Sequence, residues 1–479
     1  MNAPSPAYPP ALSEEFLNAV DQFVGPRGWS LDAEKIAPHA RESWGIGRGS
    51  ASLLLRPADV DQVSGLLKLC HRYGVPVVPQ GGNTGLVGAG IPDESGRLAV
   101  LSLTKLNRIR DVDPVGDTMT VEAGVVLETV QDRAAEVDRL FPLALSAQGT
   151  CQIGGNLSSN AGGVNVLRYG MARNLVLGLE VVLADGLIWD GLRSLRKDNT
   201  GYDLKQLFIG AEGTLGVITA AVLRLFPKPR ETQTAWLAGK SPKMAVDLLT
   251  FCRERLGDTI SSFELMADLV IDEVLNYLPD GRPPLTKPTP WHILMEVSWS
   301  LDEGLADRLQ AVLAAAMDRG LLTNGMMATS EHQRKALWLI RESPTDAFAQ
   351  AGVVLRHDVS VPVAKVPDLI ERGERLFADM IPGVRVVAFG HVGDGNIHFN
   401  LLQPETMDGA EFQAMKDRVQ QHVFDLVEDL GGSISAEHGI GRLKRAELAK
   451  RKPAIDLDLM RRMKRTLDPK NILNPGAIL

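Results

Sequence analysis

The sequence predicts an α+β fold with two large domains and a helical segment at its C-terminal end. In the first half of the chain, short strand-like runs alternate with amphipathic helices. From about residue 230, strand-like runs alternate with longer helices, which is typical of an antiparallel sheet with helices packed on it. Phe226–Pro229 looks like a boundary, and we expect domains at 1–226, 227–432 and 433–479, with the last packing back near the first.

Local signals define the elements of the N-terminal half. Ser13 is a candidate N-cap for a helix over residues 11–24, and Gly74 follows a helix expected from Val60 to Tyr73. Val77–Val78 predicts a short buried strand that enters a glycine-rich loop. Further strands are expected at Leu98–Leu103, Ile109–Val112 and Thr118–Glu122, and a helix at Leu127–Glu136.

In the second half of the chain, the predicted helices are longer and alternate with strands. Strands are expected at Thr234–Leu237, Ser262–Leu265 and His292–Val297. Helices are expected at Lys243–Arg255, Leu301–Arg319 and Val366–Met380, and a final helix at Leu457–Leu467. The Pro-rich run from Pro279 to Pro290 predicts a surface loop between two of these elements.

Charge and cysteine usage exclude several classes of protein. The formal net charge is −8, so the chain offers no electrostatic footprint for nucleic acid. We expect the cationic cluster Arg461, Arg462, Lys464 and Arg465 to form a solvated helix face. Cys70, Cys151 and Cys252 are far apart and form no disulfide framework or C-x-x-C site, which favours a reducing compartment.

We find no signal peptide and no membrane-spanning segment in the sequence. Met1–Pro6 lacks the basic and apolar regions of a signal peptide. No stretch reaches the roughly 18 uninterrupted apolar residues that suggest a membrane helix. We therefore expect a cytoplasmic protein without a membrane span.

Three glycine-rich stretches lie in the N-terminal half, at residues 80–85, 149–163 and 210–216. Glycine lets backbone amides approach a ligand, and successive amides can hold an anion such as a pyrophosphate. One such loop is commonly a tight turn, but three loops with neighbouring Asn, Ser or Thr favour a dinucleotide. None is a G-x-G-x-x-G that opens a helix, so a Rossmann-type NAD site is not supported. Gly239–Ser241 lacks the first glycine of a P-loop.

A histidine-containing hairpin is predicted at residues 386–400. If Gly393–Asn396 is its turn, His391 and His398 lie directly opposite each other, close enough to share a metal ion. Alternation along the strand places Asn400 on the same face as His398. A lone histidine pair is more often structural, so the metal interpretation needs a further ligand.

A second motif supplies that ligand. Glu437 and His438 precede a helix that we expect to begin near Arg442. Two imidazoles and one carboxylate suit Zn²⁺ or a similar divalent ion, with open positions for a substrate. The combination of both motifs therefore favours a metal site over a structural histidine pair.

The order of these motifs resembles the vanillyl-alcohol oxidase/p-cresol methylhydroxylase flavoprotein superfamily. The run Ser-Leu-Arg-Lys-Asp-Asn-Thr-Gly-Tyr-Asp-Leu-Lys at residues 194–205 is similar to the D-2-hydroxyglutarate dehydrogenase branch, and its Lys197–Thr200 stretch favours that branch over the D-lactate dehydrogenases. The resemblance covers about residues 45–479. It implies a two-subdomain FAD-binding domain of the p-cresol methylhydroxylase type and a substrate, or cap, domain.

FAD is the cofactor that the resemblance implies, with its pyrophosphate on the loops at 81–85 and 154–163. Because these loops contain no histidine, we expect the flavin to be bound non-covalently. The expected FAD-binding residues are Pro79, Gly81, Gly82, Asn83, Thr84, Gly85, Gly149, Thr150, Gly154, Gly155, Asn156, Ser159, Asn160, Gly162, Gly163, Glu212, Gly213, Gly216, Val217, Ile218 and Asn474.

The resemblance also implies roles in catalysis. It carries metal ligation, with Zn²⁺ favoured, onto His391, His398 and Glu437, and the role of catalytic base onto His438. The residues expected to contact the substrate are Arg341, Thr345, Arg356, Asn400 and His438. Arg341 and Thr345 are spaced as on one face of a helical turn.

Two positions depart from the branch pattern. The D-2-hydroxyglutarate branch usually has Lys where this chain has Arg356, and relatives often have Lys where it has Ala477. Arginine keeps the positive charge of lysine but presents a larger, planar group. The identity of the substrate therefore stays open.

The predicted reaction is FAD-dependent oxidation of a D-2-hydroxy acid, with conversion of D-2-hydroxyglutarate to 2-oxoglutarate favoured. It combines metal-assisted proton abstraction with hydride transfer to flavin N5. Two alternatives stay open: an FAD-linked D-lactate or glycolate dehydrogenase, and a non-catalytic flavin subunit that relays electrons. We expect a separate electron acceptor, such as an electron-transfer flavoprotein or a quinone, and a homodimer is compatible with this class of enzyme.

Overall fold

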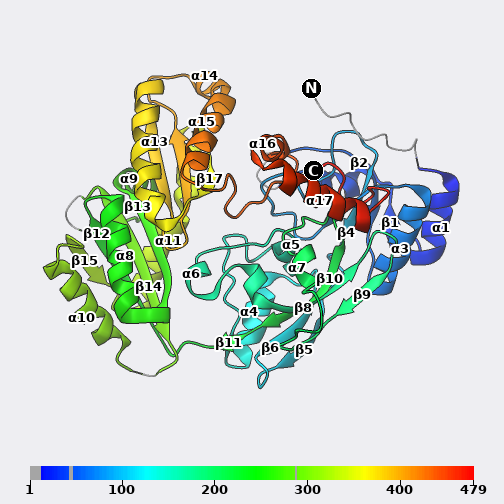
Figure 1. Ribbon diagram of the computed structural model, residues 1–479, viewed down its shortest axis with the longest axis horizontal. Helices are drawn as coiled ribbons and strands as arrows, with labels where there is room; N and C mark the ends of the chain where they lie inside the picture. Colours follow the sequence, from blue (N-terminus) through cyan, green and yellow to red (C-terminus); the bar gives the residue numbers. More distant parts are fainter. Residues whose placement is uncertain (1–11, 43–46, 286–288, 302) are drawn as a thin grey trace. The chain divides into compact units, whose positions relative to one another are not determined.

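The structure is a computed structural model that describes residues 12–42, 47–285, 289–301 and 303–479 (Figure 1). The chain is divided into two compact units. Unit 1 contains the chain up to Gly163, then Gly170–Lys228 and Glu437–Leu479, and unit 2 contains Val164–Tyr169 and Pro229–Ala436. Some predictions fall on residues outside this description. They are the absence of a signal peptide at Met1–Pro6, residue 11 of the first predicted helix, residues 286–288 of the Pro-rich run and residue 302 of the helix predicted at Leu301–Arg319.

Unit 1 contains two main sheets. One has the strand order β1-β2-β4-β3, in which β2, β4 and β3 are parallel, and the other is antiparallel with the order β5-β6-β10-β8-β9. The strands are β1 (Trp29–Ser30), β2 (Ala51–Leu55), β3 (Val77–Gln80), β4 (Leu98–Ser102), β5 (Ile109–Asp113), β6 (Thr118–Glu122), β7 (Arg139–Leu140), β8 (Val176–Val182), β9 (Ile188–Gly191), β10 (Val217–Arg224) and β11 (Phe226–Pro227). The helices are α1 (Glu14–Val24), α2 (Ala33–Ile36), α3 (Val60–Tyr73), α4 (Leu127–Glu136), α5 (Ile153–Ser158), α7 (Lys205–Phe208), α16 (Arg445–Arg451) and α17 (Ala454–Leu467).

The local signals at the ends of the first helices act as predicted. The hydroxyl of Ser13 accepts a hydrogen bond from the Phe16 amide at 3.2 Å, which caps α1. Gly74 adopts a left-handed conformation with φ of 71° and ends α3. The apolar faces of these helices meet over the parallel sheet, where Phe16, Leu66 and Leu101 are fully buried.

The C-terminal segment belongs to unit 1. The Asn474 amide donates to the Val77 carbonyl at 2.8 Å, which ties the chain end to β3. The Lys464 ammonium donates to the Asp468 carboxylate at 2.6 Å and to the Leu473 carbonyl at 2.7 Å. The expectation of a solvated cluster is therefore wrong for Lys464, since a partly buried ammonium needs such acceptors. It holds for the exposed Arg461, Arg462 and Arg465.

Unit 2 is built on one large antiparallel sheet with the strand order β15-β12-β14-β13-β18-β19-β16, and β17 pairs with β19. Its strands are β12 (Glu231–Gly239), β13 (Ile260–Ala267), β14 (Trp291–Trp299), β15 (Asn324–Met327), β16 (Val354–Leu355), β17 (Asp358–Ser360), β18 (Arg385–His391) and β19 (Asn396–Leu402). Its helices are α6 (Val166–Tyr169), α8 (Pro242–Leu256), α9 (Asp268–Tyr277), α10 (Leu305–Asp318), α11 (Glu331–Glu342), α12 (Pro344–Ala351), α13 (Val366–Met380), α14 (Gly409–Ala414) and α15 (Lys416–Asp429).

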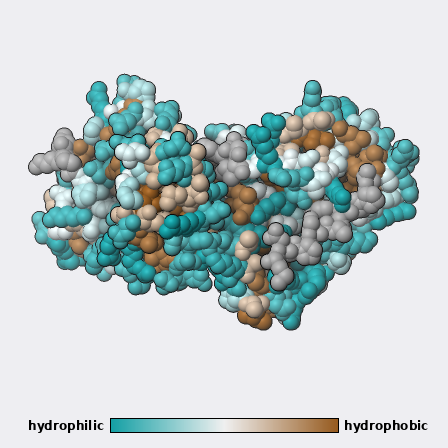
Figure 2. Space-filling model, turned by 90° about the horizontal axis from the view of Figure 1, so that it is seen from above, coloured by the Kyte–Doolittle hydropathy of each residue, from teal (hydrophilic) through white to brown (hydrophobic). Residues whose placement is uncertain are grey.

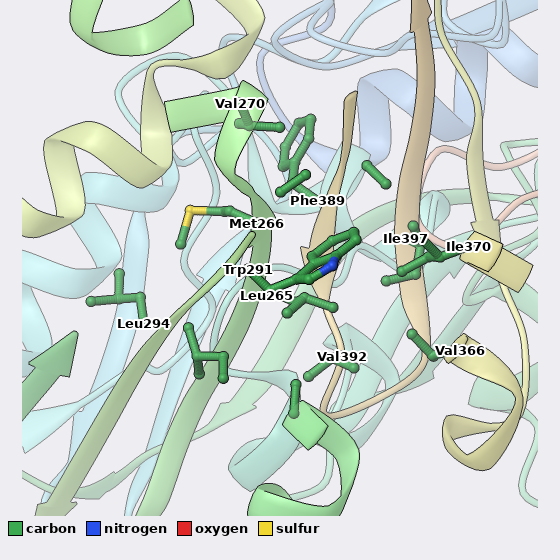
Figure 3. Close-up of a cluster of buried hydrophobic side chains, with 14 of the residues drawn as sticks. Leu265, Met266, Val270, Trp291, Leu294, Val366, Ile370, Phe389, Val392 and Ile397 are labelled. Atoms are coloured by element: carbon green, nitrogen blue, oxygen red, sulfur yellow. The ribbon is translucent and has the colours of Figure 1, made fainter. Parts of the chain in front are cut away.

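The sheet of unit 2 carries a large apolar core. Leu265 and Met266 of β13, Phe389 of β18 and Ile397 of β19 meet side chains from α9 and α13 there (Figure 3). Helix α8 contacts both α10 and α13, and α13 contacts α15, so these four helices form a row (Figure 1). The α+β fold class predicted from the sequence is confirmed.

Polar side chains dominate the visible surface of each unit, and hydrophobic side chains form scattered patches there (Figure 2). Within the described part of the chain, no helix combines the length and apolar character needed to cross a bilayer.

The three cysteines are buried free thiols. Burial raises the pKa of Cys70 and of Cys252 to about 12, and burial also raises the pKa of Cys151. Because the thiolate is the reactive form, we expect the native protein to show no fast-reacting thiol toward a disulfide reagent at about pH 8, and all three to react after unfolding. A rapidly titrating thiol in the native protein would contradict this burial.

Candidate active site

His391 and His398 lie on one face of unit 2, but the predicted register between them is wrong. His398 of β19 pairs with Phe389 of β18, whereas His391 pairs with Glu264 of β13. The hairpin closes earlier than predicted because Gly390 bends the strand at φ of 154° and the Val392 amide donates to the Gly390 carbonyl. A shift of two residues preserves the face, so the imidazole centroids still lie 5.8 Å apart.

Carboxylates stand beside both imidazoles. Oε1 of Glu264 lies 2.8 Å from Nδ1 of His391, and Oδ1 of Asp358 lies 3.9 Å from Nδ1 of His398. A carboxylate at one ring nitrogen directs the other nitrogen, Nε2, toward a metal ion. His391 therefore has the orientation expected of a metal ligand, whereas the 3.9 Å separation at His398 is too long for a direct hydrogen bond to Asp358.

Glu264 also pairs with Arg341, which lies in the last turn of α11. Nε of Arg341 donates to Oε2 of Glu264 at 2.8 Å, and Nη2 lies 2.6 Å from the same oxygen. Burial alone would raise the pKa of Glu264, but the charges of His391 and Arg341 and their hydrogen bonds outweigh it and hold this pKa at about 2. Glu264 is therefore an ionised carboxylate in the core of the sheet.

The Phe389 ring lies beside both a predicted metal ligand, His398, and a predicted substrate-binding residue, Arg341. Its ring centroid lies 4.9 Å from that of His398 and 5.2 Å from the guanidinium carbon of Arg341. Phe348 of α12 packs edge-on against the same ring at 5.9 Å. This apolar wall limits the positions open to Arg341 and His398.

Apart from His438, the predicted substrate residues occupy separate elements of unit 2. Arg341 and Thr345 do not share a helical turn, because α11 ends at Glu342 and Pro344 starts α12. Nη2 of Arg356 donates to the Thr345 carbonyl at 3.4 Å, which brings the second arginine to α12. Oδ1 of Asn400 accepts the His357 amide at 3.0 Å, so part of its side chain holds the backbone.

His438 lies on a loop that is hydrogen-bonded to other residues of unit 1 on both sides of it. Oε1 of Glu437 accepts the Gly163 amide at 2.8 Å. Glu212 accepts the amides of Ile440 and Gly441 at 2.8 and 2.7 Å. Burial raises the pKa of Glu212, and these two hydrogen bonds only partly oppose that rise.

A glycine is required beside His438. A Cβ at Gly439 would lie 2.6 Å from Oε1 of Glu212, and the residue has φ of 86°. The helix that follows this loop begins at Arg445, three residues later than predicted, because residues 439–441 form the turn against Glu212.

The glycine-rich loops of unit 1 fit a dinucleotide. Oε1 of Gln152 and Nδ2 of Asn156 are buried, and neither has a hydrogen-bond partner among the described residues. Gly85 and Gly155 have nothing within 4 Å of an added Cβ, whereas a Cβ at Gly82 would lie 2.2 Å from the Thr150 carbonyl oxygen. Unpaired polar atoms beside open glycine backbone are what a polar cofactor would satisfy.

Other residues expected to contact the cofactor are engaged within unit 1. The Asn474 side chain donates to the Ala89 and Glu212 carbonyls and accepts from Arg442, each at 2.8 Å. Asn160 Oδ1 accepts the Arg173 amide at 3.0 Å, and the side chains of Val217 and Ile218 are buried. The backbone of Asn474 is engaged as well, since its amide donates to the Val77 carbonyl and its carbonyl accepts the Ala477 amide.

The predicted catalytic set is divided between the units. His391, His398, Arg341, Thr345, Arg356 and Asn400 belong to unit 2, whereas Glu437 and His438 open the C-terminal segment of unit 1. Sequence reasoning missed Glu264 and Asp358. A charged residue in the middle of the apolar run Phe263–Met266 was the available signal for Glu264.

Comparison with protein families defines the class of protein. Residues 51–191 match the model of an FAD binding domain, and residues 228–478 match that of the C-terminal domain of FAD linked oxidases. The chain is therefore an FAD-dependent oxidoreductase.

Curated relatives narrow this class. The chain is 40% identical to the D-2-hydroxyglutarate dehydrogenase of Bos taurus over 98% of this chain and 84% of the relative, and 41% identical to that of Rattus norvegicus over 98% and 85%. The D-2-hydroxyglutarate–pyruvate transhydrogenase of Saccharomyces cerevisiae is 38% identical over 89% and 86%. The chain belongs to the D-2-hydroxyglutarate dehydrogenase family of FAD-linked oxidases and oxidises a 2-hydroxy acid.

Solved structures agree on the fold. p-Cresol methylhydroxylase with substrate bound matches with a TM-score of 0.74 at 18% identity over 98% of both chains. An alkyldihydroxyacetonephosphate synthase matches with the same TM-score at 17% identity, over 98% of this chain and 87% of the other. The p-cresol methylhydroxylase type of fold that the resemblance implied is confirmed.

The expectation of a cytoplasmic protein is wrong. The matching D-2-hydroxyglutarate dehydrogenases of Bos taurus, Danio rerio and Arabidopsis thaliana are named mitochondrial proteins. Free cysteines indicate reducing conditions but do not distinguish the compartments that provide them. The N-terminal residues that supported the expectation lie outside the described part of the chain.

Gly390 tests the geometry of the histidine strands. We expect Gly390→Ala to destabilise unit 2 by about 2 kcal/mol or more, because its Cβ would lie 2.4 Å from the Asn396 carbonyl oxygen. Gly320→Ala is the matched control: it also has a positive φ, 69°, but open space around an added Cβ, and should cost on the order of 1 kcal/mol. Equal losses in thermal unfolding would contradict the close contact at Gly390.

Proposed function

We propose that this enzyme oxidises D-2-hydroxyglutarate to 2-oxoglutarate with bound FAD and a divalent metal ion, for which Zn²⁺ is favoured. The observation that carries the choice of substrate is 40–41% identity over nearly the whole chain to enzymes named for it. The choice of a metal is supported by two imidazoles on one face of unit 2, both with a carboxylate near Nδ1.

His391 and His398 would hold the metal ion together with Glu437. The loops at 81–85 and 154–163 would hold FAD non-covalently, with the unpaired atoms of Gln152 and Asn156 as partners. When bound, FAD supplies the acceptor for two electrons and the metal ion lowers the pKa of the substrate hydroxyl.

The protein side chains bind the substrate and move its proton. Arg341 and Arg356 each provide a guanidinium for a carboxylate of the substrate. Nη2 of Arg341 is buried and, although close to Glu264, makes no properly directed hydrogen bond to a described residue. Thr345 and Asn400 orient the substrate, and His438 acts as the general base that removes the proton of its 2-hydroxyl group.

A second candidate substrate is a smaller hydroxy acid. Arg356 replaces the usual lysine of the branch, and a relative from Schizosaccharomyces pombe, 35% identical over 97% of this chain, is named a putative D-lactate dehydrogenase. D-lactate and glycolate carry a single carboxylate and would require only one of the two arginines.

The electron acceptor is proposed to be a separate molecule. An electron-transfer flavoprotein and a quinone are the first candidates. The name of the yeast transhydrogenase suggests pyruvate as a third candidate acceptor. Pyruvate would take up the two electrons and become a 2-hydroxy acid. A homodimer is a further proposal.

Flavin bleaching tests the reaction and ranks its substrates. We expect D-2-hydroxyglutarate to bleach the visible flavin band under anaerobic conditions faster than D-lactate or glycolate, because its two carboxylates can engage both arginines. We also expect it to bleach the band faster than D-malate, whose two carboxylates are one methylene closer together. A chelator should slow the bleaching, and added Zn²⁺ should restore it. If no acid bleaches the flavin after metal is restored, the electron-relay alternative replaces the proposed reaction.

His438 tests the proton transfer. We expect His438→Asn to retain FAD and to slow flavin reduction by about 10²–10⁴-fold, because the variant lacks the base. His332→Asn, which changes an exposed histidine on α11, is the control and should reduce flavin normally. Normal flavin reduction by His438→Asn in stopped-flow measurements would exclude His438 as the base.

A further inference from the structure

Glu264 is a buried charge at the centre of the unit 2 sheet. Its side chain is 1% exposed, and its strand neighbours Phe263 and Leu265 are core residues. A carboxylate in such a place is strongly unfavourable unless donors satisfy it. Strand pairing places it directly opposite His391, and α11 brings Arg341 to its other side.

The two oxygens of this carboxylate serve different partners. Oε1 lies 2.8 Å from Nδ1 of His391, whereas Oε2 lies 2.8 Å from Nε and 2.6 Å from Nη2 of Arg341. One side chain thus joins a proposed metal ligand to a proposed substrate-binding arginine. Both partners are themselves buried, so neither can turn away without leaving a polar group unpaired.

We propose that Glu264 is a positioning residue that sets the metal site and the substrate-carboxylate site together. When a metal ion replaces the Nε2 proton, His391 is neutral, and the ionised carboxylate keeps the remaining ring proton on Nδ1, which leaves the Nε2 lone pair for the metal ion. The same carboxylate holds the plane of the Arg341 guanidinium. This inference rests on the proposed function.

Only an ionised carboxylate can fill both roles. A glutamine has one oxygen and one amino group, so it must turn a donor toward either Arg341 or His391. With the oxygen toward Arg341, the amino group would favour the His391 tautomer with its proton on Nε2, which cannot bind a metal ion. With the oxygen toward His391, the amino group would face the Nε donor of Arg341.

Glu296 provides a matched control in the same sheet. Its Oε2 accepts from the Trp338 indole at 2.7 Å and from Nη1 of Arg334 at 3.2 Å. Glu296→Gln therefore also alters a largely buried carboxylate paired with an α11 arginine. Glu296 makes no hydrogen bond or ion pair with His391 or Arg341 among the described residues.

The test is Zn²⁺ affinity of the FAD-loaded protein, measured by competition with a colorimetric chelator, together with the kinetics of D-2-hydroxyglutarate oxidation. We expect Glu264→Gln to lower Zn²⁺ affinity roughly 10- to 100-fold and to raise KM, with FAD content unchanged. Glu296→Gln should leave Zn²⁺ affinity and KM at their wild-type values. Glu264→Asp keeps both acceptor oxygens and should retain more Zn²⁺ affinity than Glu264→Gln. It also provides a second variant if Glu264→Gln folds poorly.

Two outcomes would overturn the inference in distinguishable ways. If Glu264→Gln binds Zn²⁺ and substrate as the wild type does, or loses no more Zn²⁺ affinity than Glu264→Asp, Glu264 is a structural ion pair and the proposed function stands. If the wild-type protein binds no Zn²⁺ and is insensitive to chelators, the metal-assisted reaction fails and the inference fails with it.

Discussion

Burial of the Glu264 carboxylate in the unit 2 sheet requires donors for both of its oxygens, and the surrounding elements are arranged to supply them. The pairing of β13 with β18 provides His391, and α11 provides Arg341. Because β18 continues into β19 through a short connection, the same register fixes His398 opposite Phe389. A single buried charge thus constrains the residues proposed to bind metal and substrate.

Unit 1 uses buried polar groups in a comparable way. Glu212 holds the loop after His438, Asn474 joins that region to the glycine-rich loops, and Lys464 ties α17 to the chain end. Buried polar groups are costly to leave unpaired, so these contacts join segments far apart in sequence. The loops proposed to bind the cofactor and the proposed base are thereby parts of one unit, although more than two hundred residues separate Glu212 from His438.

Local sequence signals were most reliable where short-range physics decides the structure. The Ser13 cap, the left-handed Gly74 and the apolar spacing within α3 and α13 define helices without help from distant residues. The spacing rule failed at Arg341 and Thr345, because Pro344 starts a new helix between them. It failed again at the histidine hairpin, since Gly390 permits a bend that alternation does not reveal.

The sequence by itself determined the family, the glycine-rich loops proposed to bind the cofactor and the candidate residues His391, His398, Glu437 and His438, because these signals are contained in short motifs. Only the tertiary structure decided what surrounds them. Glu264 lies 127 residues from His391 and 77 from Arg341, and only strand pairing and helix packing bring the three together. Register and the pairing of buried charges depend on contacts between distant segments, which no local pattern contains.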